Sequence, residues 1–144
     1  MKTRISLIVG IIFSLLMFVG VSFLQADVIA AYDTNVAVPG LSWLDHTYVC
    51  VDNSSNCRSF PSGSATTGGS VVTSGSATDS QVLNSLCYAA GSMTYLVQGV
   101  CHQHSNRMLY PINKELDSSV NGYSTSRWLY GTYGTNFWSI YCNY

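Results

Sequence analysis

Charged side chains are scarce in this chain of 144 residues. Only 9% of the residues are Asp, Glu, Lys or Arg, and six of them are basic. A nucleic-acid backbone is bound by clustered Lys and Arg side chains, and the basic residues here are few and scattered. We therefore expect no nucleic-acid partner. A single glutamate, Glu115, also argues against the paired carboxylates of glycoside cleavage.

Lysine is missing where a phosphate-binding loop would need it. Residues 58–78 are rich in Ser, Gly and Thr, but no Lys follows the glycines and no helix opens directly from them. We expect this stretch to be a loop or hairpin connection, interrupted by one short strand at Ser70–Thr73. No internal repeat is found in the sequence, so substrate targeting has to come from the domain itself or from a partner.

The one long apolar run is at the N-terminus. Two basic residues precede Ile5–Leu24, which is almost wholly apolar, and Ala26 gives a plausible cleavage point. The pattern predicts an export signal at residues 1–26, followed by a single domain at 27–144 that is secreted or periplasmic. An uncleaved membrane anchor is the alternative, because about 20 apolar residues can span a bilayer. After cleavage, four basic residues remain against seven acidic ones, a net charge of −3.

Five cysteines follow this signal, and an odd number leaves one thiol unpaired in an oxidising compartment. A turn-rich stretch separates Cys50 from Cys57, which favours pairing of those two. Pairing of Cys87, on an expected helix, with Cys142 would tie down the C-terminal tail. Cys101 is then the free thiol. Other pairings stay open, including one in which Cys101 is bonded and a different thiol is free.

The pattern of apolar residues predicts an α+β fold in which a small antiparallel sheet packs against helices. The best strand is Leu41–Val51, which is enriched in β-branched and aromatic side chains and carries His46 near its start. The other expected elements are an irregular entry segment at 27–40, a helix at 79–90 capped by Thr78 or Asp79, an extended segment at 94–100, helices at 101–109 and 124–130, and a closing strand at 137–142.

Cys101 follows a turn at Gly99 and opens one of these helices. Unpaired N–H groups and the macrodipole at a helix N-terminus favour a thiolate over a thiol, which is how a cysteine nucleophile is made. A nucleophile also needs a base within hydrogen-bond reach. We expect His46 to come in from a facing strand, because His102 and His104 lie on the same helix and would usually point outward. Zinc binding by Cys101 and these two histidines is an alternative, but a second ligand cluster is lacking, so we expect no metal.

The pattern Gly-Val-Cys-His-Gln-x-x-Asn-Arg at Gly99–Arg107 follows a strand histidine. This order resembles the circularly permuted branch of the NlpC-type papain-like superfamily, and the motif is similar to one in small exported bacterial proteins. The branch includes cell-wall amidases and endopeptidases and the lecithin retinol acyltransferase relatives. The resemblance spans Trp43 to about Gly134 and implies a permuted papain-like fold. It also implies that Cys101 is the nucleophile and His46 the general base.

Further site residues are implied by the same resemblance. The backbone N–H of the nucleophile would contribute to an oxyanion hole. A third polar residue usually orients the histidine, and Asp52 and the Ser70–Thr73 segment are candidates for it. Gln103 and Asn106 are expected to support the site from the helix. Arg107 is expected to be solvated or paired with a nearby carboxylate.

The functional expectation is an exported cysteine hydrolase, a peptidase or amidase, that acts on a peptide or amide substrate such as a peptidoglycan peptide. No cofactor is expected, and a membrane partner is expected only if the N-terminal segment stays uncleaved. A thiol acyltransferase is one alternative. The other is a disulfide-stabilised, non-enzymatic binding or surface protein, whose ten tyrosines and three tryptophans would form a contact face.

Overall fold

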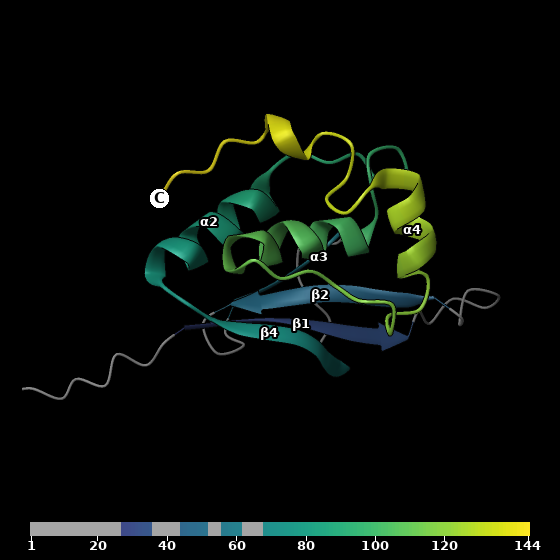
Figure 1. Ribbon diagram of the computed structural model, residues 1–144, viewed down its shortest axis with the longest axis horizontal. Coiled ribbons are helices and arrows are strands. Elements are labelled where there is room, and N and C mark those ends of the chain that lie inside the picture. Colours follow the sequence, from purple (N-terminus) through teal and green to yellow (C-terminus); the bar gives the residue numbers. More distant parts are fainter. Residues whose placement is uncertain (1–26, 36–43, 52–55, 62–67) are drawn as a thin grey trace, which may run out of the picture.

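The computed structural model describes residues 27–35, 44–51, 56–61 and 68–144. Within them, four strands form one antiparallel sheet in the order β3-β2-β1-β4, and the helices lie on one face of it (Figure 1). The predicted α+β class, a small antiparallel sheet packed against helices, is confirmed. The elements in chain order are β1 (Asp27–Asn35), β2 (Asp45–Val51), β3 (Asn56–Ser59), β4 (Ser70–Ala77), α2 (Asp79–Ala90), α3 (Cys101–Leu109), η1 (Tyr110–Ile112), α4 (Tyr123–Tyr130) and η2 (Phe137–Ser139).

β1 is a central strand that pairs with β2 on one side and β4 on the other. The prediction of an irregular entry segment at 27–40 is therefore wrong for its first nine residues. Ile29 and Ala31 belong to the hydrophobic core, and Ala30 between them is buried as well. A strand buried on both faces shows no clear alternation of apolar and polar residues, which explains why periodicity missed it. Residues 36–40 lie outside the described part of the chain.

The strand expected at 41–51 is confirmed from Asp45 onward, and residues 41–43 lie outside the described ranges. The short strand expected at Ser70–Thr73 is confirmed, but it is longer than predicted, since β4 extends to Ala77. β4 lies at the edge of the sheet and most of its residues are at least partly exposed. Ser and Thr are tolerated at such a position because they need not be buried, and this composition hid the second half of the strand.

The predicted helices are confirmed with their caps. Thr78 caps α2 because its Oγ1 accepts the Gln81 N–H at 3.3 Å, while the Gln81 side chain accepts the Thr78 N–H at 2.9 Å. Gly91 ends that helix. α3 begins at Cys101 as expected, and all nine of its residues are buried because it contacts β2, α2 and α4. Gly131, with a φ of 73°, follows the end of α4.

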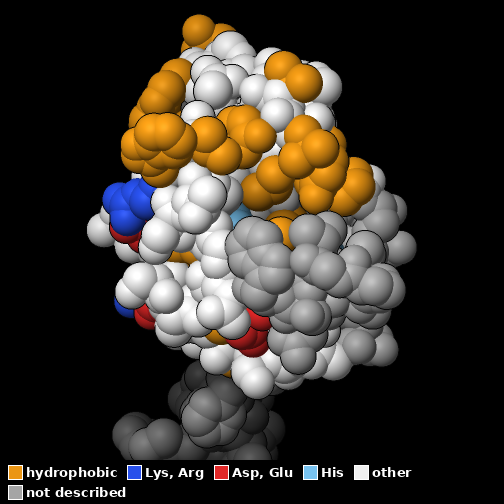
Figure 2. Space-filling view, turned by 90° about the vertical axis from the view of Figure 1, so that its right-hand side faces the viewer, with side chains coloured by type: hydrophobic (Ala, Val, Ile, Leu, Met, Phe, Trp, Pro, Cys, Tyr) orange, Lys and Arg blue, Asp and Glu red, His pale blue; other side chains and the backbone are white. Residues whose placement is uncertain are grey.

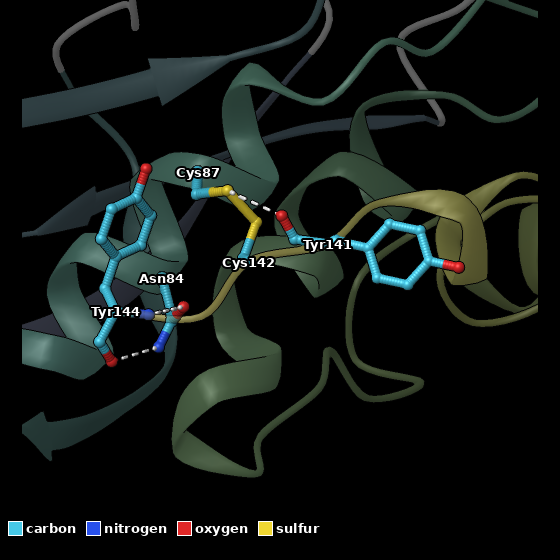
Figure 3. The surroundings of a disulfide bond; sticks show 5 residues. All are labelled: Asn84, Cys87, Tyr141, Cys142 and Tyr144. Carbon is cyan, nitrogen blue, oxygen red and sulfur yellow. Dashed lines mark hydrogen bonds between the residues drawn. A yellow bond between two sulfur atoms is a disulfide. The ribbon is translucent and has the colours of Figure 1, made fainter.

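The C-terminal tail, predicted to be a closing strand at 137–142, is not one. Phe137 begins the short helix η2 and packs against the rings of Tyr110 and Tyr133, with centroids 5.1 and 4.6 Å apart. Aromatic residues that suggested a strand thus pack as an aromatic cluster. Beyond η2, Asn84 on α2 exchanges hydrogen bonds of 3.4 and 3.3 Å with the backbone of Tyr144 (Figure 3).

The favoured cysteine pairing is confirmed. Cys87 on α2 is bonded to Cys142 in the tail (Figure 3). Cys50 and Cys57 are bonded across the β2–β3 pair, and Cys101 is a free, buried thiol. Disulfides are typical of proteins in an oxidising compartment. The predicted export signal lies outside the described residues. Among those that are described, no helix has the length and apolar character needed to cross a bilayer.

Candidate active site

The Cys101 thiol lies at the N-terminus of α3 and is 7% exposed. Val100 before it has an extended backbone, with φ −129° and ψ −170°, so the chain turns into the helix at the cysteine itself. A Cβ at Gly99 would lie 2.8 Å from the Met93 sulfur and 2.9 Å from the Gln103 Cβ. Glycine is therefore needed for the close approach that starts α3 at this point.

Hydrogen-bond donors from two elements converge on this sulfur. They are the backbone N–H and the hydroxyl of Thr47 on β2, and the backbone N–H groups of Cys101 and His102 on α3. The Thr47 hydroxyl in turn accepts a hydrogen bond of 3.0 Å from the Ser105 hydroxyl, and both side chains are fully buried. Thr47 and Ser105 were missed at the sequence level. Their spacing in the sequence could have indicated them, because Ser105 is one helical turn after Cys101 and Thr47 is next to His46.

The ionisation of Cys101 differs from the prediction. Burial raises the pKa of this thiol, and the donors from Thr47, His102 and Cys101 itself lower it without reversing that direction. The resting group is therefore a thiol, and the expectation of a resting thiolate is wrong. A helix N-terminus favours a thiolate, but here the loss of hydration on burial outweighs it.

His46 is the second residue of β2 and is partly buried, and burial lowers its pKa. It immediately precedes Thr47, the residue that contacts Cys101, and its ring interacts electrostatically with His102 and His104. Because side chains of neighbouring strand residues point to opposite faces, this adjacency does not by itself place the His46 ring at the sulfur, and the pairing of the two stays a prediction. Within the described ranges, no hydrogen bond joins the Cys101 thiol to a histidine ring. The described pairing of β3 with β2 starts at Tyr48, so His46 lies beyond the end of that ladder.

His102 holds α3 to β2 and α4. Its Nδ1 lies 2.9 Å from the Ser126 Oγ and its Nε2 lies 3.0 Å from the Asp45 carbonyl oxygen. Burial lowers the pKa of His102, and the nearby His46 lowers it further. Because both ring nitrogens have partners, His102 is a structural residue of this site.

His104 is buried as well, so the expectation that it would point outward is wrong. Its Nε2 lies 3.3 Å from the Ala89 carbonyl oxygen, and its ring stacks on Phe60 with centroids 5.6 Å apart. Burial lowers the pKa of His104 to about 4, and Arg107 and His46 act in the same direction. The imidazole is therefore neutral at pH 7, and its buried Nδ1 has no hydrogen-bond partner.

Gln103 supports the start of α3. Its side-chain oxygen accepts the Val100 N–H at 3.1 Å, and its amide nitrogen donates to the Gly131 carbonyl oxygen at 3.1 Å. The first of these bonds satisfies a backbone donor that a helix start would otherwise leave unpaired. Gln103 thus supports the site through the backbone that carries Cys101, and not through the thiol.

Asn106 links α3 to the chain that follows it. Its Oδ1 accepts the Leu116 N–H at 2.7 Å, and its Nδ2 donates to the Tyr123 hydroxyl and to the Thr132 carbonyl oxygen, each at 2.9 Å. The side chain therefore uses both of its ends in buried hydrogen bonds, and these bonds fix residues well beyond the helix.

Arg107 is fully buried, which contradicts the expectation of a solvated or ion-paired side chain. Its Nε donates to the Tyr133 carbonyl oxygen at 2.7 Å, and its terminal nitrogens donate to the Ser92 carbonyl oxygen and the Asn136 side chain. The cation that pairs with Glu115 is Arg127, at 3.6 Å. The polar residues that follow Cys101 in the motif thus serve mostly to hold the fold together through hydrogen bonds.

The candidates for a third catalytic residue have different outcomes. Asp52 lies outside the described residues. The Ser70–Thr73 segment belongs to β4, which β1 separates from β2 and His46, so its position disfavours a role there. Zinc was a further alternative for Cys101 and its neighbours. Within the described ranges, no three His, Cys, Asp or Glu side chains are grouped as metal ligands.

Comparison with known proteins does not identify this site further. No family model matches the chain, and no curated protein or solved structure matches it significantly. The resemblance to permuted papain-like enzymes is therefore an expectation carried by the motif alone.

Proposed function

We propose that this protein is an exported cysteine hydrolase, a peptidase or amidase, with a permuted papain-like arrangement of a strand histidine and a helix cysteine. The observation that carries the proposal is the state of Cys101. The four other cysteines are paired, while this thiol is free, opens α3 and lies among several backbone N–H groups. Such a position suits a nucleophile whose carbonyl substrate becomes an oxyanion.

In the proposed reaction, neutral His46 takes the proton of the Cys101 thiol as the sulfur attacks the substrate carbonyl carbon. The burial that lowers the pKa of His46 keeps its imidazole neutral, and therefore able to accept a proton, at pH 7. The new carbon–sulfur bond creates a tetrahedral oxyanion, which accepts hydrogen bonds from the N–H groups of Cys101 and His102.

The intermediate then collapses. The carbon–nitrogen bond breaks, and protonated His46 gives its proton to the leaving amine, which leaves an acyl thioester on Cys101. A water molecule attacks this thioester while His46 accepts one of its protons. The carbon–sulfur bond then breaks, protonated His46 returns the proton to the leaving sulfur, and the carboxylic acid is released with the free thiol and neutral His46 restored. If a hydroxyl or amine of a second substrate replaces water, the same steps make the protein an acyltransferase.

The proposal is tested by alkylating the oxidised protein with iodoacetamide at a series of pH values and locating the label by peptide mass spectrometry. We expect Cys101 alone to be labelled. Removal of the base in His46→Ala should slow labelling at pH 7 by roughly 10²-fold, the usual contribution of a general base. Thr34→Ala is the matched control, because Thr34 pairs with His46 across β1 and β2 but carries no imidazole. The proposal of an enzyme would be refuted if Cys101 were labelled no faster than a thiol in an unfolded chain and if His46→Ala left that rate unchanged.

One set of observations favours the alternative of a binding protein. Trp128, Trp138 and Tyr141 are 82%, 72% and 88% exposed, and large aromatic side chains at a surface are typical of contact sites. The buried thiol of Cys101 would then be an inert structural group. The alkylation experiment separates the two readings, since an inert thiol should not respond to His46.

A further inference from the structure

The turn that leads into Cys101 exposes three consecutive apolar residues. Tyr95, Leu96 and Val97 are 42%, 63% and 68% exposed, although they immediately precede the buried start of α3. This segment was expected to be extended, but Leu96 donates to the Gly99 carbonyl oxygen at 2.9 Å and the chain folds into a tight turn. Soluble proteins seldom place several apolar side chains together at a loop tip unless they bind something.

The conformation of the turn keeps these three side chains exposed. Leu96 has a φ of 63°, a left-handed conformation that is strained for a leucine. The hydroxyl of Tyr130 on α4 donates to its carbonyl oxygen at 2.7 Å, and the Gln98 side chain accepts the Thr94 N–H at 2.8 Å. Strain of this kind persists only when the surroundings impose it. The hydrogen bonds therefore keep the apolar side chains outside the core.

Helix α4, whose Tyr130 is bonded to the turn, carries exposed apolar side chains as well. Trp128 and Leu129 are exposed, and both adjoin Tyr130, which bonds the turn. Figure 2 shows this end of the molecule: hydrophobic side chains gather over the upper part of the view, a histidine is visible at their lower border, and basic side chains adjoin them only at the lower left edge. The charged residue of α4, Arg127, is paired with Glu115. The apolar surface therefore offers little to a charged or hydroxyl-rich ligand.

An aromatic wall connects this surface to the thiol. The Phe60 ring contacts both Tyr95, with centroids 5.5 Å apart, and His104, with centroids 5.6 Å apart. Tyr95 is also close enough to Cys101 that the two groups interact electrostatically. The rings of Tyr95, Phe60 and His104 thus form a row of contacts beside the turn, and one end of that row, Tyr95, lies near Cys101.

We infer that the substrate carries an apolar group next to the carbonyl that Cys101 attacks, and that this group rests on Tyr95, Leu96 and Val97 against α4. This inference rests on the proposed function and narrows it. It favours a substrate with an aliphatic or aromatic group on the acyl side of the bond over a polar wall glycopeptide. The group could belong to an apolar amino acid or to an acyl chain, which share the same chemistry.

The test measures how the reaction of Cys101 with N-alkylmaleimides depends on alkyl length, from methyl to decyl, with each rate divided by that for free cysteine. In this reaction the sulfur adds to the ring carbon–carbon double bond and the thiol proton ends on the neighbouring carbon. If the alkyl group binds the apolar surface, each added methylene should raise the normalised rate by up to roughly fourfold. A gain that stops near the size of a leucine side chain indicates an amino acid, and a gain that continues to decyl indicates an acyl chain.

Variants assign the effect to the surface. Val97→Ser and Leu96→Asn, in which asparagine tolerates the left-handed backbone, should flatten the length dependence, so that within each variant N-decylmaleimide loses its advantage over N-methylmaleimide. Val71→Ser, at an exposed apolar position on β4, is the matched control and should keep the full dependence. A normalised rate independent of length, or one equally steep in all variants, overturns the inference. Since His46→Ala should slow all reagents alike, failure of the catalytic proposal is distinguishable from failure of the apolar surface.

Discussion

The Ser105 hydroxyl donates a hydrogen bond of 3.0 Å to the Thr47 hydroxyl, and this bond joins α3 to β2 beside the Cys101 sulfur. Both side chains are fully buried. Hydroxyl groups in such a place are held by their mutual bond, because neither can reach water. The pair therefore helps to fix how α3 lies on β2 and how the Thr47 hydroxyl meets the Cys101 thiol.

Thr47→Val should weaken the fold and change the thiol together. Valine keeps the shape of threonine but leaves the Ser105 hydroxyl unpaired, which should lower the free energy of unfolding by about 1–3 kcal/mol. The Cys101 pKa should rise further, since one donor to the sulfur is lost. Urea denaturation and pH-dependent alkylation measure the two effects. Thr47→Ser should restore the pKa, and a pKa unchanged in Thr47→Val would contradict the contact.

Arg107→Met should be far more damaging than Arg127→Met. Removing the guanidinium of Arg107 leaves the Tyr133 and Ser92 carbonyl oxygens and the Asn136 side chain without their donor. We expect a loss of roughly 3 kcal/mol or more in unfolding free energy, as for other buried charge-assisted bonds. Arg127 forms an ion pair in which both side chains are about half exposed, so its loss should cost below about 1 kcal/mol. Equal losses in urea denaturation would refute the structural role of Arg107.

Acidification should destabilise the protein through His104. Its pKa is lowered to about 4 in the folded state, against 6.5 in the unfolded chain, so the unfolded state binds this proton first. Stability is therefore fully present above pH 6.5 and is lost as the pH falls toward 4. The loss should reach roughly 3 kcal/mol, at 1.36 kcal/mol for each pKa unit. Urea midpoints between pH 7 and 4 measure it. In His104→Gln the slope should be shallower, and an unchanged slope would assign the effect to other groups.

Removal of the Cys87–Cys142 disulfide should cost more than removal of Cys50–Cys57. The first closes a loop with a sequence separation of 55 and the second one of 7. Loop-closure entropy predicts roughly 4 and roughly 2.5 kcal/mol respectively. The paired Cys→Ala variants, compared by thermal and urea denaturation, should follow that order. The reverse order would mean that the tail beyond η2 contributes little to the fold.

The sequence predicted correctly those features in which a residue interacts with near neighbours in the chain, and it mostly failed where the partners are distant. The start of α3 at Cys101, the Thr78 cap and the Cys50–Cys57 disulfide follow from turn and capping rules that act over a few residues. The Cys87–Cys142 disulfide is not local, and it was favoured because few cysteines remained to be paired. β1 was missed because burial on both faces removes its periodicity, and the tail was misread because Phe137 satisfies its packing with distant rings. The ties of Asn106 and Arg107 join segments far apart in the chain, so no local pattern distinguishes them from solvated or catalytic side chains.

The hydrogen bonds of Asn106 and Arg107 also determine when α3 can be fully held in place during synthesis of the chain. In a chain delivered N-terminus first, α3 emerges before Leu116 and Thr132, the residues that Asn106 binds. Until they arrive, the Asn106 amide lacks these partners and the Arg107 guanidinium has the Ser92 carbonyl oxygen but not the groups of Tyr133 and Asn136, so α3 is held less firmly on the sheet. Proteolysis of chains ending at residue 115 should accordingly find α3 unprotected. Cys101 would then reach its buried place at the start of α3 in a lasting way only after the chain beyond Asn136 has been delivered.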